Sequence, residues 1–248
     1  MGEVISLISA NGGTGKTTAV VNLSEALALK GQKVLVIDMN TGVTALDFHM
    51  NIVNKTVYHI YDVLKGHCTI IQAFVRCESF GQLFVLPGTG SVKDAVIKEE
   101  EFHRLVRILK TQFDYILIDT PSGLSSRVET SVASSDRVIL VTTPYASSVR
   151  AAKASLSLLS EDLKGRSALL LTRLRTDLLR SASFPAPENV VTEIGLPLIG
   201  VLTESTDILL ESQEGVSVME RTAPSSRAFS NIASRLLGEN VPIIIKGK

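Results

Sequence analysis

Residues 10–18 read ANGGTGKTT and separate an apolar run of β type (VISLIS, residues 4–9) from a helical pattern that begins near residue 17. Gly12, Gly13 and Gly15 lack a Cβ, so the backbone can take positive φ angles and turn several N–H groups toward one point. A concave loop of this kind at a helix N-terminus binds anions such as phosphate. The stretch therefore predicts a strand–loop–helix unit with a phosphate site at its centre.

The end of this loop has the composition of a P-loop, which holds a nucleoside triphosphate. Lys16 is expected to reach the β- and γ-phosphates as a point charge, and Thr17 to offer its hydroxyl to Mg²⁺. The helix that follows adds the positive end of its dipole. The strict pattern has glycine where this chain has Ala10, which fits if the φ angle of Ala10 is negative.

Composition predicts one soluble domain spanning residues 1–248. The chain has 45% apolar residues, a formal net charge of zero and no linker rich in Pro, Gly or Ser. Its two cysteines, Cys68 and Cys77, form neither a disulfide framework nor a C-x-x-C metal motif, and His67 beside Cys68 has no further ligands nearby in sequence. Without a secretory leader or a stretch of transmembrane length, we expect a cytoplasmic protein.

Strand and helix patterns alternate along the chain. The clearest helices are predicted at residues 17–30, ending at Gly31, and at residues 92–110, with Phe102, Leu105, Val106 and Leu109 on one face. Near-continuous apolar strands between helices indicate an α/β fold, a mostly parallel sheet flanked by helices on both faces, as in P-loop NTPases. The expected strands are residues 4–9, 34–38, 83–86, 115–119, 137–142, 168–172 and 198–202.

Two aspartates end strands of this predicted sheet. Asp119 ends YILID as a Walker-B carboxylate would, and Asp38 ends VLVID and opens the segment 39–47. Ligands of such sheets bind at the carboxyl ends of the strands, so we expect both side chains near Mg²⁺. The turn Thr120–Gly123 is a candidate switch segment. The alternative is that either aspartate only caps the next element.

The chain resembles the MinD/ParA family of P-loop ATPases, and within it the MinD branch. The resemblance covers nearly the whole chain and rests on ordered motifs: NGGTGKTT, VLVIDMNTGVTALD, YILIDTPSG, VTTPYASSVRAAK and GVLTESTDILLESQEG. It implies a fold that binds ATP and Mg²⁺, an ATP-dependent homodimer that forms face to face, and a role in positioning cellular machinery such as the division site.

The resemblance also implies roles for individual residues. Magnesium would be held by Thr17, Asp38 and Asp119, the last two in its outer shell. Arg173, Thr203 and Glu204 fall where the family contacts adenine. The phosphates would be held by Gly12, Gly13, Thr14, Gly15, Lys16, Thr17 and Thr18.

Two departures from the family affect the expected catalytic set of Lys16, Asn40 and Asn11. Asn11 stands where the family has a signature lysine that reaches the partner's phosphates, and a cation of this kind contributes about 10³- to 10⁵-fold to phosphoryl transfer. Asn40 replaces an aspartate associated with activating water, and an amide cannot accept its proton. We therefore expect slow or lost hydrolysis. The alternative is neutral replacement, because Lys16 and Mg²⁺ remain.

The resemblance also bears on partners. The chain ends in ENVPIIIKGK, which has no amphipathic helical pattern, so stable membrane attachment is not expected. Tyr145, Ala151 and Lys153 stand in the region where relatives have acidic residues that meet a partner, so the protein partner stays unknown.

A ParA-like protein that binds nonspecific DNA is the alternative function. It would use a basic stretch of the chain, but a solvated face is favoured because the net charge is zero, so nucleic acid is not expected. A metallochaperone on the same scaffold would need clustered cysteines, which this chain lacks. The basic stretch consists of Lys164, Arg166, Arg173, Arg175 and Arg180.

Overall fold

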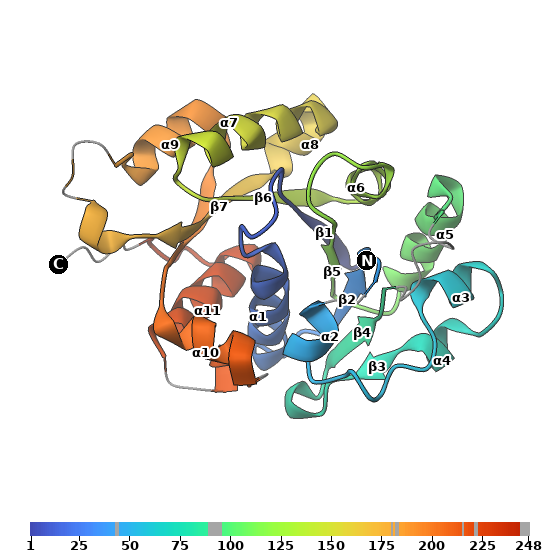
Figure 1. The fold of residues 1–248 in the computed structure, drawn as a ribbon. Coiled ribbons are helices and arrows are strands. Elements are labelled where there is room, and N and C mark those ends of the chain that lie inside the picture. Colours follow the sequence, from blue (N-terminus) through green and yellow to red (C-terminus); the bar gives the residue numbers. More distant parts are fainter. Residues whose placement is uncertain are drawn as a thin grey trace.

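The computed structural model describes residues 1–42, 45–88, 96–179, 181, 184–214, 216–220 and 223–243. Within these residues one eight-stranded sheet runs through the molecule in the order β3-β4-β2-β5-β1-β6-β7-β8 (Figure 1). All neighbouring strands are parallel except β3 and β4. The strands are β1 (Glu3–Ile8), β2 (Val34–Asp38), β3 (Val75–Arg76), β4 (Leu83–Leu86), β5 (Tyr115–Asp119), β6 (Arg137–Thr142), β7 (Ala168–Leu174) and β8 (Leu198–Thr203).

Helices cover both faces of the sheet, because its strands are apolar on both sides (Figure 1). One face packs against α1 (Lys16–Leu29), α2 (Ala45–His49), α10 (Thr206–Glu214) and α11 (Pro224–Leu236). The other packs against α3 (Ile60–Leu64), α4 (Ile70–Ala73), α5 (Glu99–Leu109), α6 (Ser126–Ala133), α7 (Ala146–Ser155), α8 (Glu161–Arg166) and α9 (Pro187–Ile194). Short 3₁₀ turns are η1 (Glu78–Phe80), η2 (Leu156–Leu158), η3 (Thr176–Leu178) and η4 (Val218–Glu220). The predicted α/β fold is confirmed.

Helix α1 has the predicted position but is buried almost all round. It begins at Lys16, one residue earlier than predicted, and ends before Gly31, whose φ of 83° is left-handed. The helix lies between the sheet and α11, so most of its side chains are buried. This burial fixes the loop at its N-terminus relative to the strands.

Helix α5 is shorter than the helix predicted for residues 92–110. Residues 92–95 of that prediction lie outside the described part of the chain, and residues 96–98 are not helical. Lys98 has an extended backbone (ψ 131°), so the helix begins at Glu99. The predicted apolar face of Phe102, Leu105 and Leu109 is buried as expected, with Val106.

The antiparallel edge strand β3 was not predicted, because two residues carry too little pattern to be recognised. It packs on β4 through Val75 and Arg76, and it lies beside Cys77 and Phe80, which are buried in the apolar layer under α1. The other strand predictions hold to within one or two residues at the ends.

Candidate functional site

The glycine-rich loop joins the central strand β1 to α1. Gly13 (φ 73°) and Gly15 (φ 83°) have left-handed backbones, which explains two of the glycines, and Ala10 has no positive φ angle, as the sequence required. Gly15 is the N-cap of α1 and offers no side chain to the amides of the first turn. The geometry thus leaves the helix N-terminus suited to bind an anion.

Side chains from the end of β1 and from β7 hold this loop in place. The Ser9 hydroxyl, directly after β1, donates to the Asn11 carbonyl oxygen at 3.0 Å. From β7, the Thr172 hydroxyl lies 2.6 Å from the Thr14 carbonyl oxygen and 3.1 Å from that of Thr142 on β6. Thr14 is buried, and among the described residues its own hydroxyl oxygen has no hydrogen-bond partner. The loop is therefore anchored through its backbone, with a polar atom left over inside it.

Lys16 connects the loop with the end of β5. The residue is only 7% exposed, and its ammonium lies 3.2 Å from the Asp119 carboxylate, whose residue is 0% exposed. The ammonium also donates to the Thr120 carbonyl oxygen. A cation buried in this way requires a negative partner and hydrogen-bond acceptors, and here a carboxylate and a carbonyl oxygen supply them.

Asp38 and Asp119 are direct neighbours in the sheet, because they pair in register at the ends of β2 and β5. The Asn40 side-chain amide lies between them and donates to the Asp38 carboxylate at 2.7 Å and to the Asp119 carboxylate at 3.0 Å. Its backbone N–H also donates to Asp38, at 2.8 Å. Both carboxylates are fully buried, so these bonds stabilise their charges.

The residues expected to hold magnesium are close together. The Thr17 hydroxyl donates to the Asp119 carboxylate at 2.8 Å, and Asp38 lies on the adjacent strand. Hydroxyl and carboxylate oxygens are the donors that Mg²⁺ prefers in proteins. Thr17, Asp38 and Asp119 thus fit a magnesium ion beside a phosphate bound in the loop. Residues 43–44 of the segment after Asp38 lie outside the described chain.

The segment after β5 is tied to β1. The Thr120 hydroxyl donates to the Leu7 carbonyl oxygen at 2.7 Å, and the Gly123 N–H donates to that of Ser9 at 3.0 Å. Gly123 has a left-handed backbone (φ 88°). The candidate switch segment Thr120–Gly123 is therefore in contact with the carboxyl end of β1, the strand that leads into the phosphate loop.

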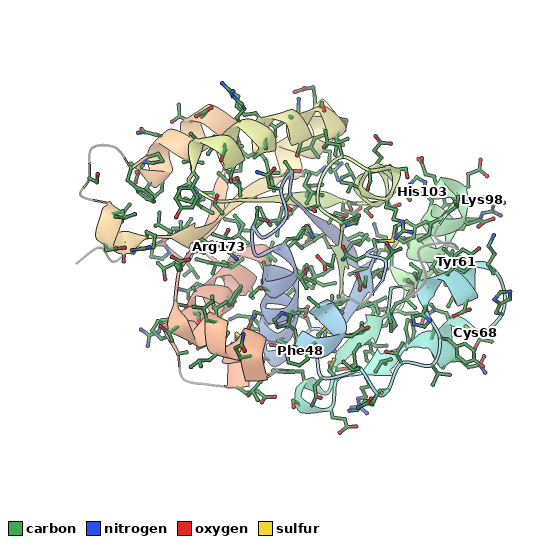
Figure 2. The ribbon with its side chains drawn as sticks, viewed as in Figure 1. Phe48, Tyr61, Cys68, Lys98, His103 and Arg173 are labelled. Atoms are coloured by element: carbon green, nitrogen blue, oxygen red, sulfur yellow. The ribbon has the colours of Figure 1, made fainter. Side chains whose placement is uncertain are left out.

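The three residues expected near adenine lie at the carboxyl ends of β7 and β8. Arg173 is exposed at the end of β7, between the helices of the two faces (Figure 2), and has a left-handed backbone (φ 52°), which is uncommon outside glycine. Thr203 pairs with Leu174 beside a register shift, and the Glu204 N–H donates to the Leu174 carbonyl oxygen at 3.0 Å. Through Thr172 they lie near the phosphate loop.

Three residues beside the site were missed from the sequence. Thr172 bonds the loop as described above. The Arg127 guanidinium, on α6, donates to the Met39 carbonyl oxygen at 3.1 Å; burial lowers its pKa, and the charge of Asp38 acts in the opposite direction. At Gly88, after β4, a Cβ would lie 2.6 Å from the Asn40 carbonyl oxygen. In the sequence, only Arg127 gave a sign of its role: a cation is unfavourable in the first turn of a helix, so its presence there indicates a partner elsewhere.

Other predicted residues do not gather as one site. The basic stretch is divided by β7, since Lys164 and Arg166 precede that strand and Arg173 and Arg175 lie at its other end. Three of these cations also have carboxylate partners close in sequence: Lys164 with Glu161, Arg166 with Asp162, and Arg175 with Asp177. Arg180 lies outside the described residues.

No group of three or more His, Cys, Asp or Glu suited to a metal occurs in the part of the chain that the structure describes. Cys68 lies near α3 and α4, at the side of the molecule away from Arg173 (Figure 2). Cys77 is buried, which raises its thiol pKa to about 12. His67 and Cys68 thus belong to no such group among the described residues.

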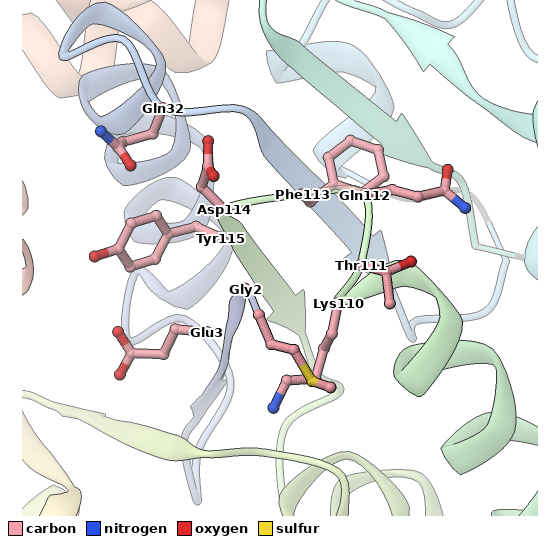
Figure 3. A pocket seen from close by; sticks show the side chains of 10 residues that line it. Gly2, Glu3, Gln32, Lys110, Thr111, Gln112, Phe113, Asp114 and Tyr115 are labelled. Carbon is pink, nitrogen blue, oxygen red and sulfur yellow. The ribbon is translucent and has the colours of Figure 1, made fainter.

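A hollow of about 640 Å³ lies at the other end of the strands from the phosphate loop, at the amino ends of β1 and β5 (Figure 3). Its charged side chains have partners: Lys110 pairs with Asp136 at 2.7 Å and Glu3 with Arg137 at 2.9 Å, and the Asp114 carboxylate accepts from the Lys33 backbone N–H at 2.8 Å. Ligands of parallel sheets bind at the carboxyl ends of strands, so this hollow is not the candidate site.

The expectation about membrane attachment concerns the end of the chain. Arg235 of α11 donates to the carbonyl oxygens of Val241 and Pro242, both at 2.8 Å, and residues 244–248 lie outside the described part. Among the described helices, none has the length and apolar character needed to cross a bilayer.

Comparison with known proteins agrees with this geometry. Residues 2–161 match the family described as AAA domain. The septum site-determining protein MinD of Synechocystis sp. is 35% identical over 98% of this chain and 92% of its own length, and that of Bacillus subtilis is 32% identical over the same shares.

Solved structures give the same result. A chain of the MinC:MinD cell division protein complex of Aquifex aeolicus superposes with a TM-score of 0.91 at 31% identity, covering 99% of this chain and 100% of that one. The septum site-determining protein MinD of Pyrococcus horikoshii, complexed with Mg-ADP, has a TM-score of 0.83 at 28% identity, covering 95% and 96%. This chain therefore belongs to the MinD/ParA family of P-loop ATPases.

Proposed function

We propose that this protein is a MinD-like switch or scaffold that binds ATP and Mg²⁺, helps to position the cell-division site, and hydrolyses ATP slowly or not at all. The observation that carries the proposal is the Asn40 amide, which donates to both buried carboxylates, Asp38 and Asp119. The relatives named above supply the process, since they are septum site-determining proteins.

The loop supports nucleotide binding through its backbone. The amides of Gly12–Thr18 would hold the phosphates, and Lys16 would move its ammonium from Asp119 and Thr120 to them. Thr17, Asp38 and Asp119 would hold the magnesium, which neutralises charge on the phosphates. Arg173, Thr203 and Glu204 would contact the base. The relative from Pyrococcus horikoshii with Mg-ADP supports this assignment.

Slow hydrolysis follows from what the two asparagines can do. Asn40 uses its N–H groups on two carboxylates, so it can orient a water through its amide oxygen but cannot take the proton. Asn11 is exposed and its side chain is short and uncharged, so it cannot supply a cation to a partner's phosphates. Lys16 stays as the cation of the loop.

Calorimetry with ATP and ADP, together with a phosphate-release assay on the same preparation, tests the proposal. We expect micromolar nucleotide affinity with turnover well below that of a MinD relative measured in parallel. The double variant Asn11→Lys, Asn40→Asp should raise turnover, and Lys16→Ala should abolish binding. Turnover equal to that of the relative would refute impaired hydrolysis, and a wild-type chain that binds no nucleotide would refute the whole proposal.

We also propose a cytoplasmic protein that forms an ATP-dependent homodimer, without stable membrane or nucleic-acid binding. The divided and paired basic stretch argues against the DNA-binding alternative. Light scattering with and without ATP measures the dimer, liposome pelleting measures membrane binding, and a salt-dependent shift of nonspecific DNA measures the alternative. The partner protein is left open, although the Aquifex relative was solved with MinC.

A further inference from the structure

Arg127 places a guanidinium where local energetics oppose it. It is the second residue of α6, and a cation in the first turn of a helix faces the positive end of the helix dipole. The residue is also half-buried, and burial disfavours its charge. Two groups offset these costs: the carbonyl oxygen of Met39, directly after β2, at 3.1 Å, and the charge of Asp38, the last residue of β2.

This arrangement balances the buried charges of the site. Asp119 has the Lys16 ammonium at 3.2 Å, and Asp38 has the charge of Arg127 near it, while Asn40 is neutral between the two carboxylates. Buried carboxylates need such compensation, because an uncompensated buried charge is strongly destabilising. Arginine keeps its proton throughout the working pH range, so this balance is a fixed property of the chain.

Resting on the nucleotide and magnesium binding proposed above, we propose that Arg127 is a positioning residue that holds the end of β2 and the start of the loop after it, through Asp38 and Met39, and thereby sets the magnesium affinity of the nucleotide site. It does so from α6, the helix that follows the segment Thr120–Gly123. The contact therefore joins the loop after β2 with the helix that follows β5.

The charge of Arg127 acts in opposite directions on the two ligands. A cation near Asp38 attracts the anionic nucleotide and repels Mg²⁺, which would bind beside the same carboxylate. Removal of the charge should therefore weaken binding of metal-free nucleotide and strengthen binding of magnesium to the nucleotide complex.

The experiment measures two constants for each variant by calorimetry: the Kd of ADP in EDTA, and the Mg²⁺ concentration that half-saturates the ADP complex. For Arg127→Gln we expect an ADP Kd about 3- to 10-fold higher and a half-saturating Mg²⁺ concentration about 3- to 10-fold lower, the effect of one unit charge at a partly buried site. A merely structural defect would weaken both.

Arg127→Lys and Arg107→Gln are the controls. Lysine keeps the charge, so both constants should lie nearer those of the wild type than those of Arg127→Gln. Arg107 is exposed on α5, and the same loss of charge there should change neither constant appreciably. Thermal unfolding of each variant confirms that it is folded before binding is measured.

Shifts of both constants in the same direction would overturn the proposal, as would a lysine variant that matches glutamine, or an Arg127→Gln variant that matches Arg107→Gln. These outcomes differ from a failure of the proposed function. In that case the wild-type chain itself binds no ADP with or without Mg²⁺, whereas here it binds ADP and only the effect of Arg127 is lost.

Discussion

Replacing Asn40 by aspartate tests the charge arrangement at the centre of the site. The Asn40 amide nitrogen lies 2.7 Å from an Asp38 oxygen and 3.0 Å from an Asp119 oxygen, and both carboxylates are fully buried. In Asn40→Asp an oxygen takes the place of that nitrogen, so two hydrogen bonds become two contacts between negative atoms. We expect the folded protein to lose stability when no metal is bound.

The size of the loss can be bounded in two ways. Two hydrogen bonds to charged groups contribute about 3–6 kcal/mol together. The cluster can instead bind a proton, and at pH 7 that costs about 4 kcal/mol for a carboxyl group whose ordinary pKa is about 4. The variant takes whichever of these two routes costs less, so protonation limits the loss to about 4 kcal/mol. We therefore expect the free energy of unfolding to fall by about 3–4 kcal/mol, which lowers Tm by about 6–16 °C for a chain of this size.

The pH dependence follows from the sign of the shift. The pKa of the new carboxyl cluster is raised in the folded state, so the penalty grows as the pH rises above the ordinary carboxyl pKa and is small near it. At pH 5 the penalty should be only about 1.5 kcal/mol. At pH 7, bound Mg²⁺ with ADP should also reduce the penalty, because the cation offsets the negative charge of the cluster.

Thermal unfolding followed by circular dichroism in EDTA, at pH 5 and pH 7 and then with Mg-ADP, is the assay. Asn51→Asp is the matched control, since Asn51 is exposed and the same change there adds a charge that water can solvate. If Asn40→Asp is as stable as Asn51→Asp in EDTA at pH 7, Asn40 does not bridge two ionised carboxylates and the reasoning is wrong.

Three further predictions concern the surroundings of the site. Gly88→Ala should lower the free energy of unfolding in urea by about 1–3 kcal/mol and weaken Mg-ADP binding. The reason is that the new Cβ would lie 2.6 Å from the Asn40 carbonyl oxygen and 3.0 Å from the Asp38 carboxylate. Gly165 has open space around it, so Gly165→Ala should change neither stability nor binding in this way. Thr172→Val should weaken ADP binding in calorimetry and lower stability by about 1–3 kcal/mol through loss of the bond to the Thr14 carbonyl oxygen, and Thr172→Ser should preserve both. Burial lowers the pKa of His49, so the wild type should lose stability relative to His49→Gln as the pH falls through about 6.5, and a constant difference in Tm between pH 7.5 and 5.5 would contradict this.

Much of the fold was predictable from the sequence because it depends on long, repeated patterns. The strand Val34–Asp38 and the strand Tyr115–Asp119 were predicted to the residue, since a buried parallel strand is a continuous apolar run with a sharp polar end. Because both strands end in an aspartate, the pattern also predicted that Asp38 and Asp119 lie together at the carboxyl ends of the strands. The short strand β3 and the start of α5 at Glu99 carry no such pattern, and tertiary packing decides them.

The site was predictable where residues adjoin a motif and unpredictable where it depends on contacts between distant segments. Lys16 and Thr17 follow from the loop alone. Thr172 and Arg127 reach the site across 158 and 88 residues of sequence, respectively, and a single sequence gives no sign of such pairs. The bridging position of Asn40 was also hidden, because it depends on the register between β2 and β5.

The reactivity of the two cysteines can measure local unfolding of the edge strand β3. Cys77 is enclosed beside β3 and has a thiol pKa of about 12, whereas Cys68 is only partly covered. A thiol reagent should therefore modify Cys68 first, and reach Cys77 only when β3 separates from its neighbour. The chain has no tryptophan whose fluorescence could follow this local unfolding, but Cys68 and Cys77 are its only thiols. Thiol modification of the native sequence therefore measures the unfolding of β3 without any engineered label.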